Sequence, residues 1–126
     1  MSCYTLSFAM ATDQLQLEAR DGQTPGQRVL ALTGVLTIST LFVFQEFAHS
    51  DQSKALILDM TGVPYIDSAG LGSIISAYVS REREARKLVL AAVNDRVKMV
   101  MTVTGVEELF KIYPGVSEAE QALAPA

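Results

Sequence analysis

The feature that most constrains the fold is an amphipathic helical pattern enclosed between two short, continuously apolar segments. The apolar positions recur at i, i+3, i+4, i+7 and i+8, which places on one helix face Leu71, Ile74, Ile75, Tyr78 and Val79. Segments 55–58 and 88–93 lack alternating polar residues, as is typical of strands buried on both faces. Strands that alternate with helices predict a largely parallel sheet packed against amphipathic helices.

The residues before this unit predict an antiparallel hairpin at one edge of the sheet. Residues 15–19 alternate apolar and polar side chains, and residues 21–26 have the composition of a turn. Residues 29–32 form a more continuous apolar strand that stops at Gly34. An antiparallel strand therefore precedes the parallel part of the sheet.

A helix over residues 39–48, with Thr37 or Ser39 as its N-terminal cap, is predicted to carry an apolar residue on its outer side. At about 100° per residue, Phe42 cannot share the inner face. That face holds Phe44, Phe47 and Ala48. Phe42 has two possible roles. It lies at the edge of the core under a neighbouring loop, or it belongs to a patch that binds a partner or a second copy of the chain.

The C-terminal third predicts a helix, a short strand and a final helix. The first helix is capped by Asn94 or Asp95 and stops at Gly105. The strand covers residues 109–113. The last helix has a capping-box pattern at residues 117–120 and ends at Leu123. The fold is therefore predicted to be α/β, with a mostly parallel sheet, an N-terminal antiparallel strand and about four helices.

Composition indicates one globular domain. The chain has 126 residues, of which 49% are hydrophobic and 19% charged, so it can bury a core and is not a disordered chain. We assign the domain to residues 15–124 and leave 1–14 as a weakly patterned segment. Met10 is an alternative to Met1 as the start of translation.

Charge and cysteine content restrict the expected cellular location and the expected classes of partner. The net charge is −4 and no basic stripe is visible, so nucleic acid is not an expected partner. The single cysteine, Cys3, cannot form an internal bridge, which favours a reducing compartment. No apolar run approaches the ~18 residues of a membrane span, and no secretory signal pattern is present. We predict a cytoplasmic domain without membrane insertion.

The densest charge cluster follows the central helix and mixes both signs, from Arg81 to Lys87. Cations suit the carboxyl end of a helix, where the dipole is negative. We interpret the cluster as a solvated face, with a contact surface as the alternative.

The loop of residues 66–72, Ile-Asp-Ser-Ala-Gly-Leu-Gly, places a hydroxyl at the start of the central helix. Helix starts collect unpaired N–H groups and the positive end of the dipole, so they favour an anion. Ser68 can therefore cap the helix or accept a phosphate. From the loop alone, capping is the simpler reading.

Several chemistries lack the residues that they need. One histidine and one cysteine give no metal-ligand set, and we expect no metal and no cofactor. A serine hydrolase would need His49 as its base, and the glycine two residues before the serine of a nucleophile elbow is missing. Gly70 and Gly72 are not followed by the Gly-Lys-Ser/Thr of a phosphate-binding loop. They permit tight helix–strand packing or the approach of another protein's backbone.

Residues 58–72, Leu-Asp-Met-Thr-Gly-Val-Pro-Tyr-Ile-Asp-Ser-Ala-Gly-Leu-Gly, resemble the signature of the STAS domain family, and of bacterial anti-sigma-factor antagonists in particular. The resemblance runs from about Leu15 to Leu123. It includes Thr104-Gly105-Val106 and Leu109-Phe110-Lys111-Ile112. It implies a protein of signal transduction and transcription regulation that is not an enzyme and acts through protein–protein interaction.

The resemblance implies partner switching controlled by one phosphate. The unphosphorylated antagonist binds an anti-sigma factor, often a GHKL-type serine kinase, and a PP2C-type phosphatase removes the phosphate that the kinase adds. Ser68 is then the phosphorylation site of a phosphoprotein. The implied partner-binding residues are Asp67, Ser68, Ala69, Gly70, Gly72, Thr37 and Phe42.

The sequence departs from the family pattern just before its first helix. Many antagonists carry Gly-Glu-Leu-Asp there, whereas this chain has Gly34-Val35-Leu36-Thr37 without either acid. This corner is more apolar than is usual for the family. The alternative function is a STAS module that is not phosphorylated, such as a scaffold or small-ligand subunit of a transport or sensory complex.

Overall fold

Six strands form one sheet whose spatial order follows their order in the chain. The computed structural model describes residues 3–6 and 15–124 of the chain. The elements are β1 (Cys3–Leu6), β2 (Gln16–Asp21), β3 (Gln27–Thr33), α1 (Leu41–Ser50), β4 (Ala55–Gly62), α2 (Ser68–Arg83), β5 (Lys87–Ala91), α3 (Asp95–Thr104), β6 (Ile112–Tyr113) and α4 (Val116–Leu123).

The sheet is antiparallel at its N-terminal edge and parallel elsewhere. β1 pairs with β2, and β2 with β3, in antiparallel fashion, whereas β3, β4, β5 and β6 are parallel neighbours. The predicted fold class is confirmed, with β1 as an additional antiparallel strand. The sequence did not reveal β1 because four residues are too few to show an alternating pattern.

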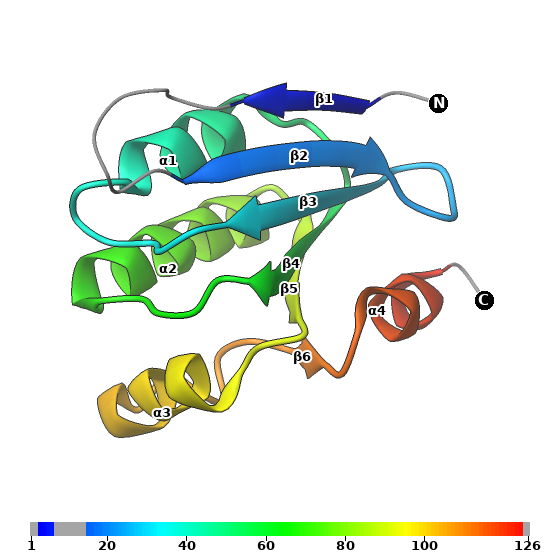
Figure 1. Cartoon of the computed structure of the whole chain (residues 1–126). Helices are drawn as coiled ribbons and strands as arrows, with labels where there is room; N and C mark the ends of the chain where they lie inside the picture. The colour runs from blue at the N-terminus through cyan, green and yellow to red at the C-terminus, as the bar shows by residue number, and fades with distance from the viewer. Residues whose placement is uncertain (1–2, 7–14, 125–126) are drawn as a thin grey trace.

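Helices cover both faces of the sheet unequally. α1, α2 and α3 lie on one side, and α4 lies alone on the other (Figure 1). The larger core holds Leu30, Leu58 and Leu90 from the parallel strands, with helical side chains such as Phe44 and Ile74. The alternate strand residues, including Val29, Ile57 and Val89, pack with Ala119 of α4. β4 and β5 are therefore buried on both faces, as their continuous apolar sequences predicted.

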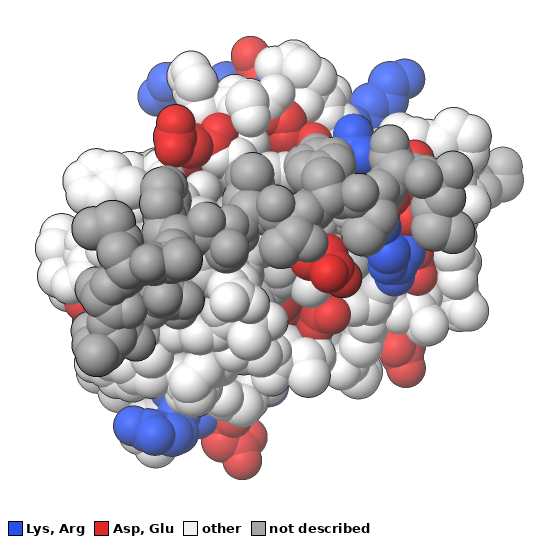
Figure 2. Space-filling model, turned by 45° about the horizontal axis from the view of Figure 1, so that its top comes forward, with Lys and Arg blue, Asp and Glu red and all other residues white. Residues whose placement is uncertain are grey.

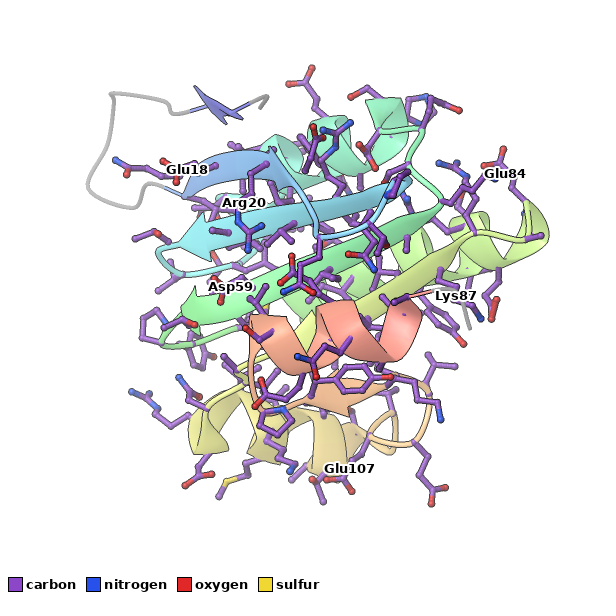
Figure 3. All side chains as sticks on the ribbon, turned by 90° about the vertical axis from the view of Figure 1, so that its right-hand side faces the viewer. Glu18, Arg20, Asp59, Glu84, Lys87 and Glu107 are labelled. Atoms are coloured by element: carbon purple, nitrogen blue, oxygen red, sulfur yellow. The ribbon has the colours of Figure 1, made fainter. Side chains whose placement is uncertain are left out.

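α4 is fastened to the sheet by a polar contact as well as by its apolar face. In Figure 3 it lies in front of β4 and β5, and Glu18 and Arg20 of β2 lie above it in the view. Glu120 is buried in α4, and its carboxylate accepts from Arg20 Nη1 at 3.3 Å and from the Gln23 amide at 3.1 Å. None of the helices in the described part of the chain has the length and apolarity of a membrane span.

Two of the predicted helix caps are wrong. α1 begins after Thr40, whose hydroxyl donates to the Val35 carbonyl at 2.8 Å instead of capping the helix. α4 begins at Val116, so Ser117 lies inside it and does not form a capping box.

The predictions for α3 are confirmed, whereas the strand after it is shorter than predicted. Asn94 caps α3 by accepting from the Val97 amide at 2.8 Å, and Gly105 ends it with a φ of +79°. The strand contains Ile112–Tyr113 alone and not the whole of 109–113.

Arg81 does not belong to a solvated face. Its side chain is 2% exposed and is paired with Asp51, 3% exposed, at 3.3 Å. Arg81 Nη2 also donates to the Ser53 carbonyl at 2.5 Å, and its Nε donates to the Lys87 carbonyl at 3.2 Å. Burial lowers the pKa of Arg81, while the neighbouring Asp51 carboxylate acts in the opposite direction. The remaining cluster residues are exposed or half-buried, as expected of a solvated face.

We expect Asp51→Asn to lower the free energy of unfolding by about 3 kcal/mol, because it leaves the buried Arg81 guanidinium without its counter-charge. Asp21→Asn is the matched control. Asp21 pairs with Arg28 at 2.6 Å but is 54% exposed, so its loss should cost less than about 1 kcal/mol. Urea unfolding of both variants measures the difference. Equal losses would contradict the structural role of the buried pair.

Candidate functional site

The candidate site is formed by two loops at the carboxyl ends of β3 and β4. The loop after β3 (34–40) and the loop after β4 (63–67) are joined by an isolated parallel bridge between Leu36 and Ile66. The Leu36 amide donates to the Tyr65 carbonyl at 3.2 Å, and the Asp67 amide donates to the Leu36 carbonyl at 3.3 Å. These bonds bring the starts of α1 and α2 together on one side of the sheet (Figure 1).

Asp67 connects both loops through its carboxylate. Oδ1 accepts from the Gly70 amide at 2.7 Å and so caps α2, and Oδ2 accepts from the Ile38 amide at 3.1 Å. A carboxylate at this position also complements the positive end of the helix dipole. The sequence predicts Ser68 either as the cap of this helix or as a phosphate acceptor. In the structure the cap is Asp67.

Ser68 is the first residue of α2, and its side chain is exposed. Within the described part of the chain, no group forms a hydrogen bond with its hydroxyl. A phosphate on this oxygen would lie at the amino end of a 16-residue helix, where unpaired N–H groups and the dipole favour an anion. The structure thus presents a free hydroxyl in a place that accommodates a negative charge.

The two glycines after Ser68 have different surroundings. A Cβ on Gly70 would lie 2.1 Å from the Leu36 carbonyl oxygen, so Gly70 allows α2 to pack directly on the loop after β3. A Cβ on Gly72 would meet no atom within 4 Å. The sequence leaves two roles open for these glycines, which are tight internal packing and the approach of another protein. Gly70 has the packing role, and Gly72 faces open space.

The loop that Asp67 joins to the start of α2 carries an exposed apolar residue, and a second one follows in α1. Phe42, in the first turn of α1, is 66% exposed, which confirms that it points away from the core. Ile38, whose amide binds Asp67, is 63% exposed. Thr37, which precedes Ile38 in the chain, and Ala69, which follows Ser68, are half-buried. Ile38 is not among the residues predicted from the sequence, although an isoleucine between turn residues is a usable signal.

Two residues near the start of α3 contact the loop that precedes Ser68. Asn94 Nδ2 donates to the Val63 carbonyl at 3.0 Å. The Arg96 guanidinium lies over the Tyr65 ring, 5.6 Å from its centre. The sequence predicts Asn94 as a helix cap only, because nothing local indicates a contact with a loop so far away in the chain.

His49 lies at the opposite end of the helix pair from Ser68. α1 and α2 run side by side in the same direction: Ile38 and Asp67 join their starts, and Asp51 and Arg81 join their ends. A groove of about 790 Å³ near these ends is lined by His49, Ser76, Ser80 and Arg81, among others, but not by Ser68. The described residues also contain no cluster of His, Cys, Asp or Glu able to hold a metal ion.

Comparison with known families identifies the domain. Residues 13–119 match the model of the STAS domain, so the chain belongs to the STAS domain family. The chain is also 33% identical over 78 residues to a Thermotoga neapolitana protein named as a candidate anti-sigma factor antagonist. That alignment covers 62% of this chain and 68% of the relative.

Solved structures confirm the fold. An anti-sigma factor antagonist from Mycobacterium paratuberculosis superposes with a TM-score of 0.77 at 21% identity, covering 90% of this chain and 97% of that one. The Bacillus cell fate determinant SpoIIAA in its phosphorylated form superposes with a TM-score of 0.66 at 15% identity. It covers 86% of this chain and 99% of SpoIIAA. At these identities the likeness establishes the architecture alone.

We expect Gly70→Ala to lower the free energy of unfolding by about 3 kcal/mol, because the new methyl group would overlap the Leu36 carbonyl and force the two loops apart. Gly72→Ala is the matched control two residues away. With open space around it, the added methyl should stabilise the helix by about 0.5–1 kcal/mol. Thermal unfolding of both variants tests the assignment, and a tolerated Gly70→Ala would contradict it.

Proposed function

We propose that this chain is an anti-sigma-factor antagonist that acts by partner switching. It binds an anti-sigma factor that is a GHKL-type serine kinase while Ser68 is unphosphorylated, and it releases this partner once Ser68 carries a phosphate. A PP2C-type phosphatase restores the binding form. The observation that carries the proposal is the exposed Ser68 hydroxyl, which is free because Asp67 caps the helix in its place.

A phosphate on Ser68 suits a switch because its effects inside and outside the molecule differ. It adds about −1.5 to −2 charges at pH 7 and three acceptor oxygens. Within the chain the start of α2 favours that charge. Against a docked partner, the phosphate next to Asp67 brings repulsion and desolvation. A penalty of about 3 kcal/mol would weaken binding roughly a hundredfold without unfolding the domain.

The partner is proposed to contact an apolar corner of the site. Val35 and Thr37 occupy positions where many antagonists have acids, and Ile38 and Phe42 are exposed beside them. A protein that reaches the Ser68 hydroxyl must also cover Ile38, because the Ile38 amide is bonded to the neighbouring Asp67. The complementary surface on the partner is therefore apolar at this point rather than basic.

In this proposal the chain is a cytoplasmic binding module and not an enzyme. Ser68 has no histidine beside it, since His49 lies in the last turn of α1. The fold alone does not decide the function, because one fold can carry many different sites. The competing role is a scaffold or small-ligand module of a transport or sensory complex, in which Ser68 is never modified.

Incubation with ATP and a GHKL-type serine kinase encoded beside this chain should add a single phosphate, located on Ser68 by tandem mass spectrometry. Ser68→Ala should abolish the modification. Ser76→Ala, which removes another exposed serine of α2, should leave it unchanged. Phosphate on Ser76, or none on the chain with any neighbouring serine kinase, would favour the scaffold.

Replacing Phe42 by serine should weaken the complex with the anti-sigma partner by about 2 kcal/mol, close to a thirtyfold rise in Kd, because a large apolar contact is lost. Val103→Ser is the control, since Val103 is 80% exposed on α3. Isothermal titration in low and high salt measures both variants. An apolar contact predicts that the loss persists at high salt. Unchanged affinity for Phe42→Ser would remove this corner from the interface, and dissociation of a self-dimer would assign it to a second copy of the chain.

A further inference from the structure

Asn94 makes two contacts in different directions through the two ends of its amide group. Its Oδ1 accepts from the Val97 amide at 2.8 Å and caps α3. Its Nδ2 donates to the Val63 carbonyl at 3.0 Å and lies 3.5 Å from the Pro64 carbonyl. The side chain thus joins α3 to the loop that ends at Asp67 and Ser68.

The loop after β4 receives its other bonds from a different direction. The bonds to Leu36 and Ile38 come from the loop after β3 and hold its last residues, 65–67. Val63 and Pro64, at its beginning, find no other donor for their carbonyl groups in the part of the chain that the structure describes. Pro64 has no N–H to donate. The Val63 amide donates locally, to the Met60 carbonyl at 3.0 Å. Among the described residues, the Asn94 amide is therefore the polar contact that joins the first half of the loop to α3.

A second contact also joins the start of α3 to this loop. Arg96, two residues after Asn94, lies over the Tyr65 ring, and such a cation–aromatic contact is weakly attractive at an exposed site. The β4–α2 loop is thus held between the start of α1 on one side and the start of α3 on the other. Ser68 follows directly on this loop.

We propose that Asn94 is a positioning residue, which holds the β4–α2 loop in the conformation that presents Ser68 to its modifying enzyme and partner. This inference rests on the proposed function of Ser68. An asparagine is suited to this role because its carbonyl oxygen and its NH₂ group serve two different elements at once. Residues that provide only the oxygen would cap α3 equally well but would leave the Val63 carbonyl without its donor from α3.

Three substitutions separate the two contacts. Asn94→Asp and Asn94→Ser keep an oxygen for the Val97 amide, and both are good helix caps, but they lack the NH₂ donor. The aspartate introduces a charge that the serine does not, so the pair separates loss of the donor from charge repulsion. Asn94→Ala loses both contacts.

Amide hydrogen exchange followed by NMR tests the contact without any partner. Asn94→Asp and Asn94→Ser should speed exchange by about tenfold at the Val63 amide, which donates to the Met60 carbonyl in the first half of the loop. That is the change expected when one hydrogen bond of ordinary strength is lost. Exchange at Met101 in α3 should not change, whereas Asn94→Ala should speed exchange in both regions. If Asn94→Ala alone has an effect, Asn94 is only a cap and the proposal is wrong.

Phosphorylation kinetics test the functional half, with the GHKL-type serine kinase that modifies the wild-type chain. Asn94→Asp and Asn94→Ser should raise KM for the chain by about tenfold at unchanged kcat, because the presenting conformation is less populated. Unchanged KM together with faster loop exchange would show that the contact exists but does not position Ser68. If no serine kinase modifies the wild-type chain, the proposed function fails, while hydrogen exchange still decides the role of Asn94 in the loop.

Discussion

The Asp67 carboxylate is the interaction on which the rest of the site depends. One oxygen caps α2 at Gly70, and the other holds the Ile38 amide of the loop before α1. Because one short side chain serves two elements, the starts of both helices are fixed relative to each other. This arrangement frees Ser68 from capping, leaves its hydroxyl exposed, and holds the backbone of Ile38 against the start of α2. The chemistry proposed for Ser68 therefore follows from the position of its neighbour.

The opposite ends of the same two helices are joined by a different kind of contact. Arg81 of α2 reaches Asp51 at the end of α1, and both side chains are buried. Since α1 and α2 are parallel, the helix pair is fastened by polar groups at each end and by apolar packing between. The face in Figure 2 carries small, separate groups of both charge signs and no extended field of one sign.

The features of the fold that could be predicted from the sequence are those that depend on short-range periodicity. The helical spacing from Leu71 to Val79, the two doubly buried strands and the outward position of Phe42 are all properties of neighbouring residues. The residues that shape the site depend on distant contacts. Asp67 binds Ile38 across 29 residues, Arg81 binds Asp51 across 30, and Asn94 binds Val63 across 31. Those contacts form only after the strands are in register, so a local pattern cannot contain them.

The central claim is that one phosphate on Ser68 controls partner binding while the fold stays intact. Isothermal titration of the anti-sigma partner with the same chain, before and after stoichiometric phosphorylation, tests it most directly. The predicted result is a Kd about a hundred times weaker for the phosphorylated form, with the melting temperature of the free chain unchanged within about 2 °C. Equal affinity of the two forms, or a phosphorylated chain that has lost its fold, would contradict it.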